Sequence, residues 1–501
     1  MDYQTFFLSL FCLLTFFYVL TISRLRNTQL PPGPRPFPIV GNLLILGDKP
    51  YQTLATLSKR YGPLMSIKLG TKTTIVVSSH DMAKEFFHDH DRSFCNRSVP
   101  ETAKMVDHHK SSIVWLPVGD QWRRLRRITK EHFFSVQCLD ASKHLREIKV
   151  RELLDHVERC CINGTVVNIG AVAFTTTLNI FSNYMFSMDL AQYDSVSSQE
   201  FKDAVWALME VGGKPNVVDF FPILKSFDPQ RLGRRVHHYG KKLLTIFDMI
   251  IEQRLQIRTN SSPSDSILST TTDVLDILLN LNLKDESVFS RNDIRHLLLD
   301  LFIAGTDTIS STLEWAMAEL IRNPEKMECA RLQILKLLQN ENRSIQEQDI
   351  SQLPYLQAII KETLRLHPAG AFLVPHEAIE NVQVNGFMVP KNAQILCNLW
   401  AMGRDPCVWS NPYTFMPERF IGVETDYRGQ DYEFIPFGVG RRICPGLNIA
   451  HRMLHIMLGS LIHKFDWQLE GNTRAHDIDM GEKFGITLPR NIPLMVNPIK
   501  L

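Results

Sequence analysis

The sequence predicts a mainly α-helical fold with a minor β-sheet region, preceded by one N-terminal transmembrane helix. Two long stretches, residues 139–256 and 293–321, have helical character with few breaks. Strand-forming residues are concentrated in residues 61–79, which Gly70 interrupts, so a small sheet is predicted there. The transmembrane prediction rests on an uncharged apolar run at residues 6–22.

The size of the chain, 501 residues, exceeds that of a usual single domain. No Gly/Ser linker, low-complexity tract or internal repeat divides it, so one large domain is predicted for residues 39–501. The net charge of +2 argues against nucleic acid as a partner. Nine cysteines without regular spacing are typical of reduced thiols that face the cytosol.

Residues 1–29 are predicted to be a membrane anchor. Asp2 is the only charge before the apolar run, and Arg24 and Arg26 follow it. The positive-inside rule therefore places the remainder of the chain in the cytosol. A cleaved signal peptide would need a basic n-region and a small-residue cleavage site, and the sequence has neither.

Residues 30–38 follow the anchor and contain five prolines. Proline disfavours helix and favours a stiff extended segment. Such a segment alone would suit a linker or an SH3 ligand equally well. Its place directly after an anchor favours a hinge.

Residues 437–446, FGVGRRICPG, place one cysteine between glycines on a tight loop. Pro445 suits the first turn of a helix, so Cys444 is predicted at a helix N-terminus, where N–H groups and the helix dipole favour thiolate. With apolar Phe437 and the cation Arg442 nearby, the loop suits an iron porphyrin with its propionates. The alternatives are a buried structural cysteine or a zinc site, and no CxxC or HxxxH partner for zinc lies nearby.

This loop resembles that of the haem-thiolate cytochrome P-450 family, which reads F-x-x-G-x-R-x-C-x-G. Phe437, Gly440, Arg442, Cys444 and Gly446 fill every specified position. The resemblance implies haem b as cofactor, with Cys444 as the axial iron ligand, and makes the large domain a haem-thiolate catalytic domain. It also implies electrons from NADPH through NADPH-cytochrome P-450 reductase, with cytochrome b5 as a further partner.

A second match lies within residues 293–321, where AGTDT fits the family's [AG]-G-x-[DE]-T. Glycine and threonine weaken a helix, and such a local conflict often marks a functional site. The resemblance makes Ala304, Gly305, Asp307 and Thr308 catalytic: Gly305 leaves room for O2, Thr308 hydrogen-bonds the bound O2, and Asp307 helps to relay protons. The alternative is a core helix whose threonine hydroxyls bond back to the preceding turn.

Residues 119–130 are predicted to form a helix in which Trp122 and Arg126, four positions apart, share one face. The pair matches the family's W-x-x-x-R, which contacts the haem propionates. His376 stands where many plant members carry arginine, and a propionate hydrogen bond is expected from it as well. The remaining basic face is either solvated or a docking surface for an acidic reductase, and it comprises Arg123, Arg127 and Lys130.

Two further motifs match a structural network of the family. Glu362 and Arg365 fill the E-x-x-R pattern, and Arg419 belongs to P-E-R-F. By the resemblance these three side chains form a buried network behind the haem and take no part in the chemistry. Leaving any one charge unpaired should be strongly destabilising.

The resemblance also implies a substrate pocket with apolar walls. The predicted pocket residues are Ile113, Val114, Leu301, Ala371, Phe372, Leu373, Phe484 and Ile486, with residues 368–376 forming a substrate-lining strand. Residues 108–117 and 482–488 look most like the plant geraniol hydroxylases and ferruginol-type diterpene oxidases. The expected activity is therefore hydroxylation of a small apolar mono- or diterpenoid, once or successively, in plant specialised metabolism.

The expected location is the endoplasmic reticulum membrane, spanned once, with the catalytic domain in the cytosol. Alternative substrates are a phenylpropanoid or a fatty acid. An O2-independent isomerase or dehydratase, such as allene oxide synthase, is disfavoured because its relatives lack the threonine found here at Thr308. A haem-based gas sensor would need no organic pocket.

Overall fold

The computed structural model describes residues 29–193, 199–260, 273–286, 289–339, 343–471 and 474–501. Within this part of the chain helices dominate and the strands form small sheets, which confirms the predicted mainly α-helical fold with a minor β-sheet region. The predicted anchor at residues 6–22 lies outside the described residues. Among those described, no helix is both long enough and apolar enough to cross a membrane.

The α-helices in chain order are α2 (Leu43–Leu46), α3 (Pro50–Tyr61), α4 (His80–Lys84), α5 (Glu101–Met105), α6 (Asp120–Ile128), α7 (Val136–Ala141), α8 (Lys143–Asn163), α9 (Ile169–Phe186), α10 (Gln199–Gly213), α11 (Val217–Phe220), α12 (Leu232–Asn260), α13 (Val274–Lys284), α14 (Arg291–Arg322), α15 (Pro324–Leu338), α16 (Pro354–Leu366), α17 (Leu399–Met402) and α18 (Leu447–Lys464). Short 3₁₀ or π turns are η1 (Glu85–Asp89), η2 (His108–Lys110), η3 (Thr129–Phe133), η4 (Pro222–Leu224), η6 (Glu347–Gln352), η7 (Pro417–Phe420), η8 (Gly440–Arg442) and η9 (Ala475–Asp477).

The strands are β1 (Leu64–Leu69), β2 (Lys72–Val77), β3 (Asn96–Arg97), β4 (Val167–Asn168), β5 (His376–Glu377), β6 (Val382–Val384), β7 (Phe387–Val389), β8 (Gln394–Cys397), β9 (Phe465–Leu469) and β10 (Met495–Lys500). The largest sheet has the order β1-β2-β8-β5-β3, in which only β2 and β8 are parallel. Pairing of β3 with β5 sets Arg97 opposite His376, almost three hundred residues away in sequence. Smaller sheets have the orders β4-β10-β9 and β6-β7.

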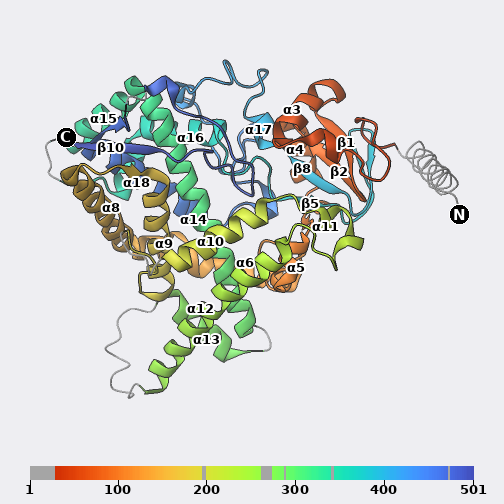
Figure 1. Ribbon diagram of the computed structural model, residues 1–501, viewed down its shortest axis with the longest axis horizontal. Coiled ribbons are helices and arrows are strands. Elements are labelled where there is room, and N and C mark those ends of the chain that lie inside the picture. Colours follow the sequence, from red (N-terminus) through yellow and green to blue (C-terminus); the bar gives the residue numbers. More distant parts are fainter. Residues whose placement is uncertain (1–28, 194–198, 261–272, 287–288, 340–342, 472–473) are drawn as a thin grey trace, which may run out of the picture.

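Helix α14 is the element around which the helical part packs. Figure 1 places β1, β2 and β8 toward one end of the molecule and α8, α15 and α18 toward the other, with α14 between them. The helix begins at a capping box, in which the Ser290 hydroxyl accepts from the N–H of Asp293 and the Asp293 carboxylate accepts from that of Ser290. It ends before Pro324, close to the predicted bounds of 293–321.

The strand prediction for residues 61–79 is also confirmed. β1 and β2 pair across a turn at Gly70, whose φ of 54° favours glycine. The proline-rich residues 30–38 contain no helix and lie against β1, where Ser66 donates its N–H to the carbonyl of Pro32 (2.9 Å) and its hydroxyl to that of Pro31 (2.6 Å).

Two local predictions were wrong. Within residues 368–376 only His376 belongs to a strand, because Pro368 and Pro375 cannot donate to a ladder. Helix α18 starts at Leu447 rather than at Pro445, since Gly446 is its N-cap.

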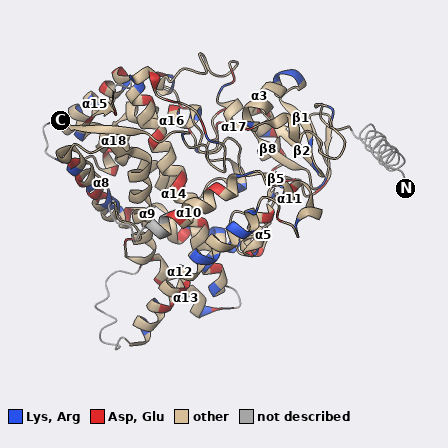
Figure 2. Cartoon of the chain, in the orientation of Figure 1, with Lys and Arg blue, Asp and Glu red and all other residues tan. Residues whose placement is uncertain are grey.

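Charged residues of both signs alternate along the surface helices (Figure 2). Between α12 and α13 they form ion pairs, in which Arg254 contacts Asp273 and Asp276 at 2.8 Å and Arg258 contacts Asp276 at 2.7 Å. Such mixed charge agrees with the near-neutral composition.

Candidate active site

A cavity of about 710 Å³ lies between α14, the cysteine loop before α18 and the largest sheet. Cys444 of the loop and Thr308 of α14 both face it. Residues from α10, α11 and the C-terminal segment around Phe484 close the cavity from other sides. The two principal motifs, far apart in sequence, therefore converge on one space.

The cysteine loop is held in a conformation that depends on glycine. Gly438 and Gly440 have φ of 72° and 66°, and a side chain at Gly440 would lie 3.0 Å from the carbonyl oxygen of Phe87. The N–H of Cys444 donates to the carbonyl of Phe437 at 2.8 Å. These constraints aim the sulfur of Cys444 at the cavity.

Burial raises the pKa of the Cys444 thiol, contrary to the direction predicted from its place at a helix N-terminus. The backbone of Gly446, the Arg126 side chain and the backbone of Leu447 each lower this pKa, but burial outweighs them. A metal cation bound to the sulfur would reverse the direction, because a coordinating thiol is deprotonated.

Three arginines lie beside the loop. Arg442 donates to the carbonyls of Cys95 (2.9 Å) and Ile113 (3.1 Å), and its guanidinium lies 4.6 Å from the ring centre of Trp122. Arg126 donates to the carbonyl of Ile443, within the loop itself. Trp122 thus lies behind Arg442, and Arg126 and Arg442 both line the cavity.

The third arginine, Arg97, was not predicted from the sequence. It donates to the carbonyl of Val374, and its Nε is buried with no hydrogen-bond partner among the described residues. Burial, followed by the neighbouring Arg442 and Arg126, holds its pKa well below the ordinary value. No helical or motif pattern marks Arg97 in the sequence, since only the β3–β5 pairing brings it here.

These arginines have no carboxylate partner within the described part of the chain, so they provide an uncompensated cationic wall. Burial likewise lowers the pKa of His376, whose Nδ1 lies 2.7 Å from the carbonyl oxygen of Phe94. A flat ligand bound through the Cys444 sulfur and carrying carboxylates would supply the missing negative charge. The residues therefore fit a haem with its propionates.

On α14, Ala304, Gly305 and Thr308 line the cavity. The Thr308 hydroxyl donates to the carbonyl of Ala304 at 2.8 Å, the bond to the preceding turn that the alternative interpretation predicted. This bond uses the proton of the Thr308 hydroxyl but not its oxygen lone pairs. The oxygen is therefore still able to accept a hydrogen bond from a group in the cavity.

Two residues of the same motif have surroundings that the sequence did not predict. A side chain at Gly305 would lie 2.5 Å from the ring of Phe181, so the close packing of α9 against α14 requires glycine at this position. Asp307 is a buried residue of α14, and the Thr487 hydroxyl donates a hydrogen bond to its Oδ2 at 2.5 Å. Burial raises the pKa of Asp307, and Thr487 lines the cavity.

The predicted apolar wall is largely present. Ile113, Val114, Leu301, Phe372, Leu373, Phe484 and Ile486 all line the cavity. Ala371 does not, because it is buried against Tyr51 and Leu488. Apolar wall residues that were not predicted come from several elements and include Phe87, Phe134, Phe181, Leu208, Met209 and Leu396.

Comparison with known proteins identifies the family. The Cytochrome P450 family profile matches residues 31–495. The chain belongs to the cytochrome P450 family. It is 51% identical to cytochrome P450 76T24 of Catharanthus roseus (97% of this chain, 96% of that protein), 46% identical to geraniol 8-hydroxylase of the same plant (100% of both) and 44% identical to ferruginol synthase of Salvia miltiorrhiza (97% of both).

As a P450, the protein is a monooxygenase, an oxidoreductase that uses haem b and receives electrons from NADPH through a reductase. The cysteine, the three arginines and the apolar cavity are the parts of this chain that suit that cofactor and a small organic substrate.

The predicted network behind the cysteine loop is assembled in the P450. Arg365 pairs with Glu362 through two hydrogen bonds, 2.7 and 2.8 Å long, and Arg419 Nε lies 3.0 Å from Glu362 Oε1. The N–H of Met416 donates to the same carboxylate, and both arginines also donate to backbone carbonyls, among them that of Thr414. All three charged groups thus have partners inside the protein.

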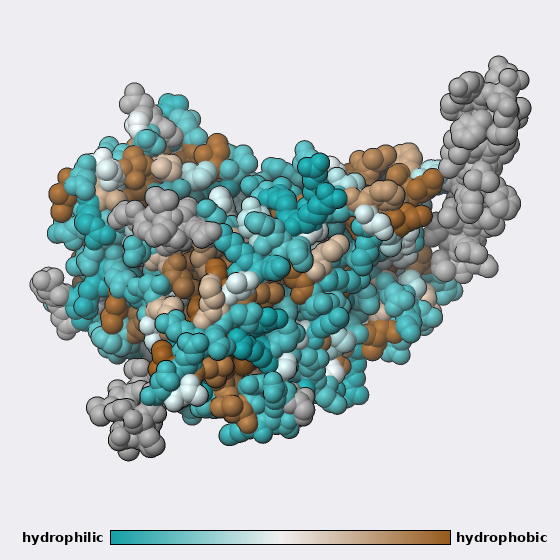
Figure 3. All heavy atoms as spheres, turned by 60° about the horizontal axis from the view of Figure 1, so that its bottom comes forward, coloured by the Kyte–Doolittle hydropathy of each residue, from teal (hydrophilic) through white to brown (hydrophobic). Residues whose placement is uncertain are grey.

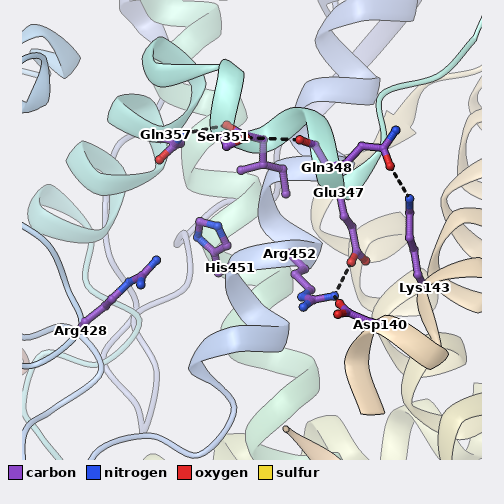
Figure 4. A pocket seen from close by; sticks show the side chains of 10 residues that line it. Asp140, Lys143, Glu347, Gln348, Ser351, Gln357, Arg428, His451 and Arg452 are labelled. Atoms are coloured by element: carbon purple, nitrogen blue, oxygen red, sulfur yellow. Dashed lines mark hydrogen bonds and ion pairs between the residues drawn. The ribbon is translucent and has the colours of Figure 1, made fainter. Parts of the chain in front are cut away.

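A second pocket, of about 510 Å³, lies on the other side of α18 (Figure 4). Ile449, Ala450 and Leu454 of α18 face the main cavity, whereas His451 and Arg452 face this pocket. Its charges pair with one another: Arg452 Nη1 lies 2.8 Å from Glu347 and 2.6 Å from Asp140. Lys143 donates to Gln348 at 3.2 Å.

Proposed function

We propose that this P450 hydroxylates a small apolar terpenoid at an unactivated or allylic carbon. The observation that carries the proposal is the composition of the cavity wall, in which apolar side chains surround the space that Cys444 and Thr308 both face. Relatives named geraniol 8-hydroxylase and ferruginol synthase, 46% and 44% identical over nearly the whole chain, support the terpenoid class. Hydroxylation in successive rounds is part of the proposal.

Haem b, when bound, supplies the iron that activates O2. The chain's own residues would hold it: Cys444 would ligate its iron, and Arg97, Arg126, Arg442 and His376 would meet its propionates. Gly438 and Gly440 allow the loop its shape, Gly446 is the N-cap of α18, and Phe437 lines the cavity. The apolar wall excludes water from the reacting carbon.

Proton supply is assigned to Thr308 and Asp307. The Thr308 hydroxyl faces the cavity while donating to Ala304. Asp307 is connected to the cavity through Thr487, whose hydroxyl donates a hydrogen bond to the Asp307 carboxyl group. Because burial raises its pKa, Asp307 is a better proton carrier near neutral pH than an exposed carboxylate.

Regiochemistry is assigned to Phe372 and Phe484. Their rings are 6.3 Å apart in a perpendicular arrangement, and Phe484 also stacks on Tyr51 with ring centres 5.7 Å apart. One methylene in an apolar pocket is worth only about 1–3 kcal/mol, so such a pocket discriminates weakly by size. Rigid rings that limit sliding are better suited to choosing the carbon.

The proposed location is the endoplasmic reticulum membrane, with residues 1–29 as a single-span anchor. Phe37, Ile39 and Leu44 are exposed near the start of the described chain, and Ile223 and Phe227 are exposed after α11. The two segments flank the β1–β2 turn, because Gly41 bridges to Leu69 and Thr71 donates to the carbonyl of Phe220 (3.0 Å). Figure 3 shows apolar surface on this end of the molecule, which suits contact with lipid.

The test is incubation of the full-length protein with NADPH-cytochrome P450 reductase and a panel of mono-, sesqui- and diterpenoids. Formation of a hydroxylated product that requires both NADPH and O2 is expected. Efficient turnover of phenylpropanoids or fatty acids, with no terpenoid oxidised, would overturn the substrate class. Conversion of an organic hydroperoxide without NADPH would favour an isomerase or dehydratase.

The haem assignment has its own test. The reduced carbon monoxide complex should show the red-shifted Soret band of a thiolate-ligated haem. Cys444→Ala should abolish this band, and Cys407→Ala should retain it because Cys407 is an exposed cysteine away from the cavity. Retention of the band in the Cys444 variant would contradict the assignment.

A further inference from the structure

A chain of buried polar side chains connects α14 to the segment between α5 and α6. His296 and Asp300, one turn apart on α14, face His108 and Ser112. His108 Nδ1 lies 2.9 Å from His296 Nδ1, and His108 Nε2 lies 2.9 Å from Asp300 Oδ1. Each of these four residues is more than nine-tenths buried, which is unusual for groups of this polarity.

The carboxyl group of Asp300 is the centre of this cluster. Its Oδ1 accepts from the Ser112 hydroxyl at 2.8 Å as well as from His108. Its Oδ2 accepts from the backbone N–H of Ile113 at 2.8 Å. Both oxygens are therefore directed at the segment before α6, and the Ser112 hydroxyl accepts in turn from the N–H of Val114 at 3.0 Å.

Ile113 is held from the other side as well. Its carbonyl oxygen accepts from Trp122 Nε1 at 3.0 Å and from Arg442 Nη1 at 3.1 Å. Arg442 is two residues from Cys444, so the backbone of Ile113 is fixed at its N–H by α14 and at its carbonyl by the cysteine loop. The side chain of Ile113 lines the cavity between these two elements.

The cluster lies on the stripe of α14 that contains the oxygen motif. Asp300, Ala304 and Thr308 are spaced one turn apart and all line the cavity. At 1.5 Å rise per residue, Asp300 is about 6 Å along the helix from Ala304 and about 12 Å from Thr308. Any shift of Ile113 therefore changes the cavity wall within reach of a substrate at the reacting centre.

We propose that Asp300, supported by His108 and Ser112, is a positioning group that fixes Ile113 and thereby selects the carbon of the substrate that is oxidised. The inference rests on the proposed function for its substrate. Asp300 acts through Ile113 rather than on the reacting atoms. A displacement of about 1 Å can change a rate by about a hundredfold, so a small shift of Ile113 is enough to redistribute products.

The first experiment measures amide hydrogen exchange in residues 111–117 of the full-length, haem-loaded protein. Asp300→Leu removes the acceptor of the Ile113 N–H, and exchange at that amide should accelerate roughly tenfold or more. Asp300→Asn should restore most of the protection, because the amide oxygen can still accept from the N–H of Ile113. Unchanged exchange in Asp300→Leu would overturn the proposal.

The matched control is Ser310→Ala. Ser310 is also buried on α14, but its hydroxyl bonds only to the carbonyls of Thr306 and Asp307 on the same helix, and it is absent from the cavity wall. It should leave exchange in residues 111–117 unchanged. If Ser310→Ala accelerates that exchange as much as Asp300→Leu, the effect is general loosening and the proposal is wrong.

The second experiment measures the ratio of oxidised positions in the terpenoid product. Asp300→Leu should change this ratio severalfold, and Asp300→Asn should restore it. In a double-mutant cycle, Asp300→Leu should have a much smaller effect on the ratio once Ile113→Ala is present, because Asp300 holds Ile113 in place. Full additivity of the two changes would overturn the role of Ile113.

If Asp300→Leu fails to retain haem, Ser112→Ala tests the same proposal with a milder change. It removes one of the hydrogen bonds to Asp300 and should change both readouts in the same direction by a smaller factor. If no terpenoid is oxidised by the wild-type protein, the proposed function fails, and hydrogen exchange still decides whether Asp300 holds Ile113.

Discussion

Two groups of charged side chains, one buried and one half-buried at the cavity wall, differ in whether their charges are balanced. In the first, Glu362 accepts from both Arg365 and Arg419, so every charge has a protein partner. In the second, Arg97, Arg126 and Arg442 have no carboxylate partner among the described residues, and burial lowers the pKa of all three.

The difference separates a structural role from a binding role. Burying a charge is unfavourable unless it is paired, so a balanced group can persist in the protein alone. A group of three half-buried cations with no carboxylate partner is well suited to bind an anion that the polypeptide does not provide. We therefore propose that the first group has a structural role and that the second binds the haem propionates.

The largest expected effect comes from breaking the balanced group. Glu362→Gln leaves Arg365 and Arg419 without a counter-charge, and removing one partner of a buried ion pair costs about 3–5 kcal/mol. Urea unfolding of haem-loaded protein should show the loss, and little holoprotein should accumulate. Wild-type stability in Glu362→Gln would mean that the network is dispensable.

The unbalanced group should respond in the opposite sense. Arg97→Met removes an uncompensated buried cation, so the haem-free protein should be no less stable than the wild type. Haem affinity should fall by about 10- to 100-fold, because a charge-assisted hydrogen bond is worth about 1.5–3 kcal/mol.

Arg419→Met is the matched control for Arg97→Met, since it removes an arginine from the balanced group and should destabilise the haem-free protein. Measurement of haem transfer to apomyoglobin, together with unfolding of the haem-free forms, separates the two. Equal loss of apoprotein stability in both variants would remove the distinction between the groups.

Thr308 sharpens the comparison, because its hydroxyl is satisfied within the helix and also faces the cavity. Thr308→Ala should change the free energy of unfolding by about 1 kcal/mol or less. Product formed per NADPH should nevertheless fall severalfold. Thr306 bonds back to Phe302 at 2.7 Å but is fully buried, so Thr306→Ala should leave that ratio unchanged. An unchanged ratio in Thr308→Ala would make its hydroxyl structural.

The smallest effect is expected at exposed charges. Arg123 pairs with Asp120 at 2.8 Å on the surface, and Arg127 is exposed on the same helix. We propose that these arginines help to dock the reductase. Arg123→Glu with Arg127→Glu should weaken the apparent reductase affinity severalfold at low salt, with substrate binding unaffected. If titration with reductase gives wild-type affinity, these side chains are merely solvated.

The sequence was sufficient for elements whose pattern is local. The bounds of α14, the turn between β1 and β2, and the approach of Cys444 to the cavity all follow from short motifs with a physical reason. Glu362 and Arg365 are three apart on one helix, so their pairing could be predicted as well.

What could not be predicted depends on contacts between distant segments. Arg97 meets His376 only because β3 pairs with β5. Ala371 has the right composition for a pocket, yet Tyr51 and Leu488 cover it. Likewise, Asp300 acquires its role through a segment almost two hundred residues earlier, and nothing in the local pattern of α14 indicates it.

Gly305 and Phe181 are in contact, so the side-chain volume allowed at one position depends on the residue at the other. A methyl group at Gly305 would collide with the Phe181 ring, so Gly305→Ala alone would force α9 and α14 apart. With Phe181→Ala, the same methyl group would be accommodated, and the remaining space would open toward Thr308. An engineer seeking to admit a bulkier molecule should therefore enlarge the cavity at Phe181, and related chains should vary at these two positions together.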